Sequence, residues 1–420
     1  MKNLNSGWTI EEQCPQCGAP ITLQETDRIF SCDFCRVKLY ILSSGFFRYY
    51  IPPPKDLKEE IVYAPYWRFR GMSFIFSQTG LKHRIIDANR LATGHQLLPA
   101  SLGLRPQTQK IQFLSSEVTG KFLKQKIPFK QILTDIENPG ETSPGQNKLP
   151  SVLHQGFIGE TTSLIYAPFY LKDYKFYDAL LEKAVKTKPG IRTPKSVPLE
   201  TDINWNRSFL STLCPLCGWD LGSEKESCIL MCSNCCTAWK ASLSGFKKVM
   251  FKIIEVKAEN ILYVPFWKIQ TAVDKLPLQS YADLARLANL PRIASRAWEK
   301  EKLYFWAPAF KVAPKLFLRL SKQLTLSNFT AKAETGSAKT GLSFFPVTLP
   351  ATEAVESIRV TLFHLFINKK KFYSILPEVH AVAKKQELIY LPFTIRANEI
   401  VQVQMKFSIS KNALKIGRAL

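Results

Sequence analysis

The chain has 420 residues and a formal net charge of +23 at pH 7, with 46% hydrophobic and 22% charged residues. This composition is that of a globular protein and excludes a chain disordered throughout, and the length suffices for two domains that each bury a core. No apolar run approaches the ~20 residues of a membrane-spanning helix, and the polar N-terminus lacks the apolar core of a secretory signal, so we expect a cytoplasmic protein.

The positive charge is unevenly distributed along the chain. Residues 1–200 hold 26 Lys and Arg against 18 Asp and Glu, whereas residues 201–420 hold 31 against 16. Such an excess favours polyanionic partners, namely nucleic acid, an anionic membrane surface or an acidic protein. A dispersed set of surface lysines that serves solubility alone explains it equally well, because the densest cluster is the short run Lys369–Lys371.

In chain order, the first motif is a pair of Cys-x-x-Cys units, Cys14/Cys17 and Cys32/Cys35, with Gly18 directly after the first unit. Two such turns facing each other supply four thiolates to a tetrahedral zinc ion, and a glycine at that place accommodates a positive φ. Four cysteine ligands leave no open position for water, so the predicted site is structural. A redox dithiol and a rubredoxin-like iron site are the competing interpretations.

The same motif returns 200 residues later as Cys214, Cys217, Cys232 and Cys235. Tyr63-Ala-Pro65-Tyr-Trp67 likewise returns as Tyr263-Val-Pro265-Phe-Trp267. A shared register of this kind predicts a tandem duplication with two structural zinc ions. Two cysteines, Cys228 and Cys236, have no counterpart in the first half, and we interpret them as buried or spare thiols.

Aromatic and β-branched residues surround a proline at four places, which predicts strands. The two further copies are Tyr166-Ala-Pro168-Phe and Tyr390-Leu-Pro392-Phe. Because proline lacks an N–H, we expect edge strands or bulged ones. A bent core strand and an exposed aromatic platform for stacking are both open interpretations.

Helices are sparser in the pattern. Ser280–Lys300 has helical apolar spacing that Pro291 would divide, and weaker helical patterns cover Lys121–Glu137 and Tyr177–Val185. A loop is expected at Asn138–Ser151. A looser match joins Leu98-Pro99-Ala100 to Ala307-Pro308-Ala309, and the extra residues of the second half are expected at Ser327–Thr340 or near Ile358–Lys371.

Together these features predict a β-rich α+β protein in which each half is a four-cysteine zinc ribbon followed by a β-rich body. The predicted divisions are ribbon 1 at residues 1–50, body 1 at 51–185, a proline-bearing linker at 186–206, ribbon 2 at 207–250 and body 2 at 251–420.

The Cys-Pro-x-Cys-Gly…Cys-x-x-Cys units resemble the zinc-ribbon superfamily of transcription factors, primosomal helicases and ribosomal proteins. The likeness covers about 25 residues in each half. A ribbon followed by Val62-Tyr-Ala-Pro-Tyr-Trp-Arg-Phe-Arg-Gly71 resembles bacterial zinc-ribbon proteins without assigned activity. The chain lacks the phosphate-binding loop of helicases, so the resemblance implies metal ligands and a bacterial cytoplasmic setting but no activity.

The sequence offers no catalytic constellation, since its five histidines form no metal-ligand pair and no glycine-rich nucleotide loop is present. We therefore predict a non-enzymatic zinc-binding adaptor or scaffold in a protein complex, whose partner is another protein, an acidic one being compatible with the basic charge. The alternatives are nucleic-acid binding through the basic second half and peripheral binding to an anionic membrane. Ribbon 1 argues against the first alternative, because residues 11–35 hold five acidic residues against Arg28.

Overall fold

The computed structural model describes residues 8–95, 97–103, 109–129, 131–132, 152–173, 175–186, 199–200, 207–288, 295–327, 329, 334–335, 341–366 and 370–418. The predicted loop at Asn138–Ser151, Pro291, Lys369 and most of the predicted linker lie outside these residues. The chain divides into two compact units: unit 1 comprises Met1–Arg70, Asp87–Asn147 and Thr161–Ser211, and unit 2 comprises Gly71–Ile86, Lys148–Glu160 and Thr212–Leu420. The predicted ribbon, body and linker boundaries stay predictions.

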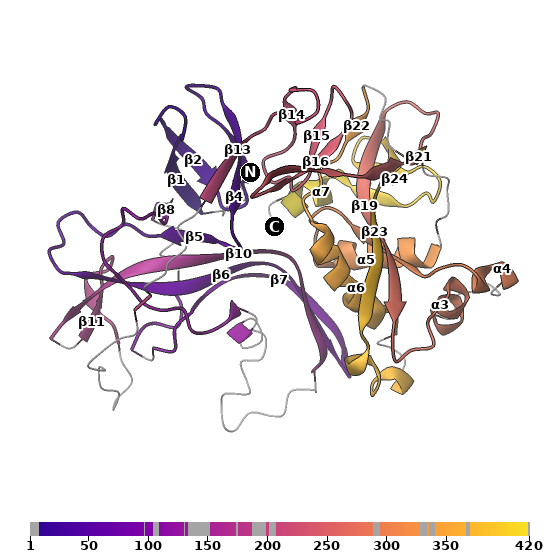
Figure 1. Cartoon of the computed structure of the whole chain (residues 1–420). Helices are drawn as coiled ribbons and strands as arrows, with labels where there is room; N and C mark the ends of the chain where they lie inside the picture. Colours follow the sequence, from indigo (N-terminus) through magenta and orange to yellow (C-terminus); the bar gives the residue numbers. More distant parts are fainter. Residues whose placement is uncertain are drawn as a thin grey trace. The chain divides into compact units, whose positions relative to one another are not determined.

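Strands dominate the chain as far as residue 211 (Figure 1). They are β1 (Thr9–Gln13), β2 (Pro20–Gln24), β3 (Ile29–Ser31), β4 (Lys38–Ser43), β5 (Phe47–Tyr50), β6 (Ile61–Ser77), β7 (Gly80–Leu91), β8 (Ile111–Phe113), β9 (Lys121–Phe122), β10 (Val152–Lys172), β11 (Lys175–Asp178), β12 (Lys183–Ala184) and β13 (Arg207–Ser211). The main sheet has the order β12-β11-β10-β5-β8-β1-β2, and β6 pairs with β10, β7 and β9. A smaller sheet has the order β13-β4-β3.

The second part of the chain combines strands with helices. Its strands are β14 (Leu221–Gly222), β15 (Leu230–Cys232), β16 (Ala238–Ser242), β17 (Gly245–Val249), β18 (Phe251–Ile253), β19 (Ile261–Val273), β20 (Tyr304–Pro308), β21 (Glu334–Thr335), β22 (Ser343–Phe344), β23 (Ala381–Ile395), β24 (Glu399–Gln402) and β25 (Ser408–Ser410). Its helices are α3 (Tyr281–Ala288), α4 (Arg296–Glu299), α5 (Pro314–Ser327), α6 (Ala351–Phe366), α7 (Lys411–Arg418) and the 3₁₀ turns η1 (Lys370–Phe372) and η2 (Leu376–Glu378).

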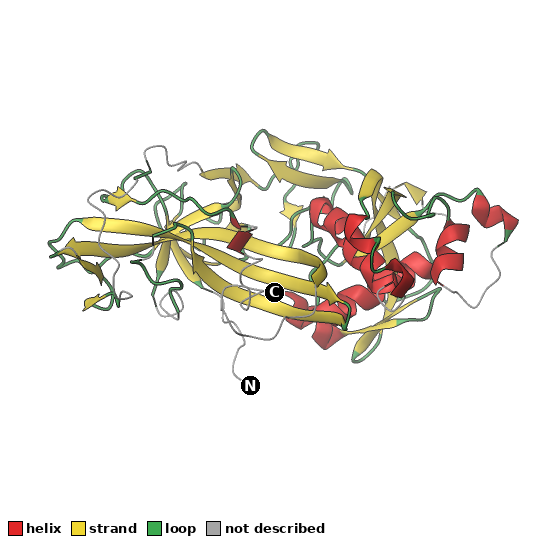
Figure 2. Cartoon of the chain, turned by 90° about the horizontal axis from the view of Figure 1, so that it is seen from below, coloured by secondary structure: helices red, strands yellow, loops and turns green. Residues whose placement is uncertain are grey.

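The sheet β20-β19-β23-β18-β21 forms the centre of unit 2, with β22 beside β19 and the pair β24-β25 beside β23. Helices α5 and α6 pack on it, and Figure 2 shows the helices gathered over this sheet. Each unit has its own apolar core, one around Tyr49, Tyr66 and Phe169 and the other around Phe266, Phe310 and Phe393. The β-rich α+β prediction is thus confirmed. No helix in the described part of the chain is both long and apolar enough to cross a membrane.

The prolines of the four Tyr-x-Pro-aromatic strands lie in central strands, so the expectation of edge strands is wrong. On one side of β19, the strand β22 pairs with Leu262 and Tyr263. From Phe266 onward, the strand β20 pairs with β19 instead. On one side of β23, the strand β18 pairs with the residues up to Tyr390. From Phe393 onward, the strand β24 pairs with β23 instead. A proline therefore sits where one neighbouring strand replaces another, and its missing N–H leaves no ladder bond unmade.

The same hydrogen bonds occur around both pairs of these strands. Ala92 N–H donates to Pro65 O at 2.8 Å, and Ala309 N–H donates to Pro265 O at 3.1 Å. The indole N–H of Trp67 reaches the carbonyl of Ile127 at 2.8 Å. That of Trp267 reaches the carbonyl of Leu349 at 2.9 Å. Two further pairs of bonds correspond. Ile51 N–H donates to Tyr166 O, as Ile254 N–H does to Tyr390 O. Ala179 N–H donates to Pro168 O, as Val403 N–H does to Pro392 O.

These bonds correct two expectations about the second half. Ala309 matches Ala92, an offset of 217, so the looser match to Ala100 is wrong. The offset is 200 at Tyr63 and Tyr263, so most of the extra residues lie between Tyr263 and Ala309, a stretch that contains α3 and α4. Most of the alternative location Ser327–Thr340 lies outside the described residues, and in Ile358–Lys371 the helix α6 supplies buried core residues.

Of the predicted helices, Ser280–Lys300 contains α3 and α4, with the residues around Pro291 outside the described part. Tyr177–Val185 is not a helix but the turn between β11 and β12. The Asp178 carboxylate accepts the backbone N–H groups of Leu180 and Leu181 at 3.0 and 3.1 Å, and Glu182 has a φ of 52°. This local capping stabilises a turn in place of a helix. Lys121–Glu137 begins with the strand β9.

Candidate metal centres

Both four-cysteine groups are built from two tight turns each. In the first turn of ribbon 1, Gly18 N–H donates to Cys14 O at 2.8 Å, and Gly18 has a φ of 74°. In ribbon 2, Gly218 donates to Cys214 O at 2.9 Å with a φ of 71°. A β-carbon is disfavoured at such φ values, which explains the glycine after each first Cys-x-x-Cys unit.

The second turns close with a non-glycine residue at positive φ. Arg36 has a φ of 61° and Cys236 a φ of 53°. Cys32 N–H donates to Val37 O at 2.9 Å, and Cys232 N–H donates to Thr237 O at 2.8 Å. The two turns of each ribbon therefore bring their four sulfur atoms to one place.

The sulfur atoms of each group lie within 4.8 Å of one another. In ribbon 1 the Sγ–Sγ distances are 3.7 Å for Cys14–Cys35 and 3.6 Å for Cys17–Cys32. In ribbon 2 the distances Cys214–Cys235 and Cys217–Cys232 are both 3.5 Å. A tetrahedron with Zn–S bonds of ~2.3 Å places its sulfurs about 3.8 Å apart, whereas a disulfide would require ~2.05 Å. The spacing therefore fits a shared metal ion and not two disulfides.

Backbone amides favour the thiolate form at these positions. Hydrogen bonding from the Cys35 backbone, followed by that of Phe34, offsets burial and lowers the pKa of Cys32 to about 7. Burial raises the pKa of Cys214, but the backbone N–H groups of Leu216 and Cys217 outweigh it and lower this pKa to about 6. Although a hydrogen bond from the Val37 backbone lowers it, burial and the neighbouring thiols raise the pKa of Cys35 to about 12, and burial raises the pKa of Cys232 to about 12. Backbone amides therefore favour the metal-binding thiolate at one cysteine of each group, while another keeps its proton without a cation.

Ribbon 2 has a polar second layer that the sequence did not reveal. The Trp239 indole N–H donates to Thr237 Oγ1 at 2.8 Å, and Thr237 Oγ1 lies 3.0 Å from Cys235 Sγ. Because the indole can only donate, the Thr237 oxygen accepts from it, and the hydroxyl proton is available to a thiolate at Cys235. Val37 stands at the matching place in ribbon 1. Comparing the two ribbons position by position would have identified this difference.

The two remaining cysteines lie outside the groups. Cys228 is half-buried, and its thiol contacts the carbonyl of Val347 at 3.3 Å. Cys236 is half-buried, and burial raises the pKa of its thiol. Neither thiol belongs to a group of potential metal ligands in the described residues.

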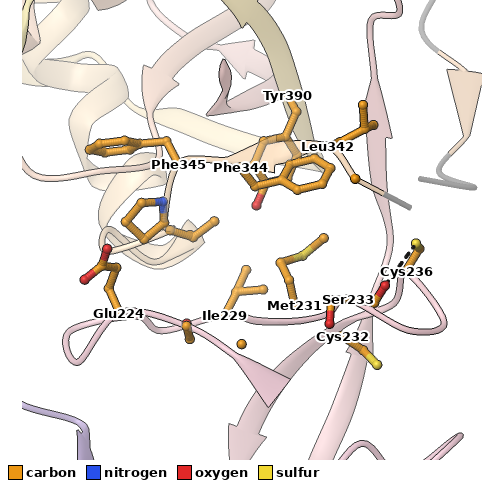
Figure 3. Close-up of a pocket in the computed structure, with 15 residues that line it drawn as sticks. Glu224, Ile229, Met231, Cys232, Ser233, Cys236, Leu342, Phe344, Phe345 and Tyr390 are labelled. Atoms are coloured by element: carbon orange, nitrogen blue, oxygen red, sulfur yellow. Dashed lines mark hydrogen bonds between the residues drawn. The ribbon is translucent and has the colours of Figure 1, made fainter. Parts of the chain in front are cut away.

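A cavity of about 490 Å³ lies beside ribbon 2, within unit 2. Figure 3 shows Phe344 and the hydroxyl of Tyr390 on one wall, facing Ile229 and Met231 of the ribbon on the other. Cys232 of the second four-cysteine group belongs to the same lining. Burial raises the pKa of Tyr390, so its hydroxyl stays protonated.

Ribbon 1 is joined to its body through a buried charge cluster that the sequence also did not reveal. Arg68 of β6 is fully buried, and its guanidinium contacts the Glu25 carboxylate of the ribbon at 3.1 Å. It also pairs with Asp87 of β7 and lies 4.3 Å from the ring centre of Trp8. A buried arginine requires such partners, and here the ribbon supplies a carboxylate and an aromatic face.

Comparison with protein-family models, with curated proteins and with solved structures finds no match for this chain. The resemblance to zinc ribbons therefore rests on the chain's own residues. Among the described residues, Cys14/Cys17/Cys32/Cys35 and Cys214/Cys217/Cys232/Cys235 are the groups of His, Cys, Asp and Glu able to hold a metal ion. The structure thus brings together all eight cysteines expected from the sequence, in two groups of four.

Proposed function

We propose that this protein is a non-enzymatic adaptor of the cytoplasm whose two duplicated modules are each stabilised by one structural zinc ion. The observation that carries the proposal is the pair of four-thiol groups with tetrahedral spacing. All-cysteine coordination is typical of structural zinc, and such a site has no position left for a substrate or a reactive water. Reducing conditions in the cytoplasm keep cysteines available as ligands.

The repeated hydrogen bonds around Pro65 and Pro265 support duplication of the whole module. Two modules in one chain suit a protein that presents surfaces to several partners at once. An acidic protein partner is favoured over nucleic acid, because the basic excess lies outside ribbon 1 and that ribbon is itself acidic.

The test is purification of the tagged, zinc-loaded protein from its native cytoplasm, with metal content measured on the same sample. We expect about two zinc ions per chain and a stoichiometric protein partner that survives nuclease treatment. A monodisperse chain without a partner and with a measurable turnover would contradict the proposal. Affinity for DNA or RNA that falls steeply between 50 and 200 mM salt would favour the nucleic-acid alternative instead.

A further inference from the structure

Lys268 of β19 lies at the place that Arg68 occupies in β6. Each follows its proline by three residues, and Pro65 and Pro265 accept the same backbone hydrogen bond from Ala92 and Ala309. Arg68 is fully buried under Glu25 and Trp8 of ribbon 1. Lys268 is only half-buried, and the aromatic rings over which its ammonium group lies are Tyr304 and Trp306 of β20.

The surroundings of Lys268 come from its neighbouring strands. The register places Trp306 of β20 and Glu387 of β23 on either side of it. Its ammonium group lies 4.3 Å from the ring centre of Tyr304 and 5.5 Å from that of Trp306. Among the described residues its ammonium group has no hydrogen-bond or ion-pair partner, and burial lowers its pKa.

The one carboxylate in the middle of this surface is already shared. Glu387 Oε1 accepts Lys252 Nζ at 2.7 Å and Lys385 Nζ at 3.0 Å. Three ammonium groups therefore surround a single central carboxylate, with Glu301 contributing a weaker negative charge. We call Lys252, Lys268, Lys385, Glu387 and Tyr304 the β19 basic surface.

We infer that the β19 basic surface is a docking site for an acidic protein segment that presents a carboxylate beside an aromatic ring. The occupant's chemistry is that of Glu25 and Trp8, which cover the matching arginine in the first half. The excess of lysines over carboxylates gives the charge complementarity, and Tyr304 offers an aromatic face. This inference rests on the proposed adaptor function and names the partner chemistry of one of its surfaces.

The experiment measures binding of a fluorescein-labelled peptide, two copies of Glu-Trp-Glu joined by glycines, to the zinc-loaded full chain by fluorescence anisotropy. Lys268→Met removes the charge and keeps the apolar stem, and we expect it to weaken binding about tenfold. Lys248→Met, on the exposed strand β17, is the matched control and should leave the Kd unchanged. The peptide with Gln in place of Glu should not bind.

A second variant should raise the affinity for the peptide instead of lowering it, and misfolding cannot explain a gain in affinity. Glu387→Gln removes the internal carboxylate and releases Lys252 and Lys385, both partly solvent-exposed, for the peptide. We expect this variant to bind several times more tightly. Unchanged affinity in both Lys268→Met and Glu387→Gln would overturn the inference, as would equal binding of the Gln peptide.

Two other occupants are outcomes of the same series. Tighter, Lys268-dependent binding of a dT20 oligonucleotide would overturn the inference in favour of nucleic acid, and Lys268-dependent dimerisation in sedimentation would overturn it in favour of a second copy. Zinc content is measured in parallel. If the chain binds two zinc ions and Lys268→Met does not change peptide binding, the docking inference fails and the adaptor proposal stands. If peptide binding depends on Lys268 but the chain holds no zinc, the adaptor proposal fails and the docking surface stands.

Discussion

At the scale of single residues, matching positions in the two halves carry different side chains with different neighbours. Arg68 receives its counter-charge from a ribbon, whereas Lys268 has Glu387 in the adjacent strand. The Thr237 hydroxyl lies within hydrogen-bond distance of Cys235 Sγ, whereas Val37 at the matching place has no hydroxyl. Positions that share the same backbone hydrogen bonds thus carry different side chains in the two halves.

Arg68 should be among the most stabilising residues of unit 1. Arg68→Met leaves Glu25, with 1% of its side chain exposed, as an uncompensated buried carboxylate. We expect a loss of about 3–5 kcal/mol in the free energy of unfolding, measured by chemical denaturation. Lys175→Met on β11 is the exposed control, and a loss equal to that control would contradict the buried pair.

Thr237 should strengthen the second metal site. Thr237→Val removes the hydroxyl near Cys235, and we expect zinc affinity at ribbon 2 to fall about 10–100-fold in competition with a chelator. Val37→Thr is the reciprocal change in ribbon 1 and should raise affinity there. Equal zinc affinities in the parent chain and Thr237→Val would show that the hydroxyl does not act on the metal.

At the scale of elements, close packing fixes the helix α7 against the segment between β20 and α5. A β-carbon at Gly417 of α7 would lie 2.2 Å from the carbonyl oxygen of Lys311 and 2.9 Å from Cα of Val312. Both atoms belong to the backbone and cannot move aside cheaply. The helix α7 therefore requires glycine at this contact.

Gly417→Ala should destabilise unit 2 by about 1–3 kcal/mol, because the added methyl forces α7 away from its place. Gly94→Ala is the control, since nothing lies within 4 Å of its added methyl and Gly94 is exposed. Thermal unfolding of both variants measures the difference. Equal melting temperatures would mean that α7 does not pack on Lys311.

The packing of α6 should make stability sensitive to acid. His154 of β10 stacks on Phe363 with ring centres 4.4 Å apart and packs beside Phe76 at 6.0 Å, and burial, then the charge of Arg359, lower its pKa to about 3. The folded state holds the neutral imidazole, so this contribution is complete above the unfolded pKa of about 6.5 and is lost as pH falls toward 3. At pH 4.5 the loss is on the order of 2 kcal/mol.

His154→Phe keeps a ring in the stack and should flatten the decline in stability between pH 6.5 and 4.5, measured by urea unfolding at each pH. Part of the decline remains, because burial also lowers the pKa of His364 to about 4. His380→Gln, at an exposed position, is the control and should leave the slope unchanged. A slope equal to that of the parent chain in His154→Phe would contradict the stacked, neutral histidine.

At the scale of the whole molecule, each unit has its own core and its own four-thiol group. If each group holds one ion, Cys17→Ser and Cys217→Ser should each reduce zinc from two ions per chain to one, and the double variant to none. Metal analysis of the purified chains measures this. Cys236→Ser is the thiol control and should retain two ions. Loss of both ions in a single variant would mean that the sites are not independent.

The sequence by itself determined the two thiol groups and the β-rich character, because local spacing dictates both. A Cys-x-x-Cys turn followed by glycine needs few neighbours to form, and strand-forming residues mark their own segments. The eight cysteines were therefore predictable to the residue, and the Tyr-x-Pro-aromatic motifs were predictable as strands, though not the full length of those strands.

Only the tertiary structure decided how those strands pair and what surrounds each charge. A proline in a strand cannot donate one hydrogen bond of the sheet. Which strands pair with the residues before and after it depends on segments far away in the chain. The turn at Asp178 replaced a predicted helix because a side-chain cap outweighed weak helical spacing. Arg68 and Lys268 look alike in sequence, and their different burial arises from partners that are distant in sequence and close only after folding.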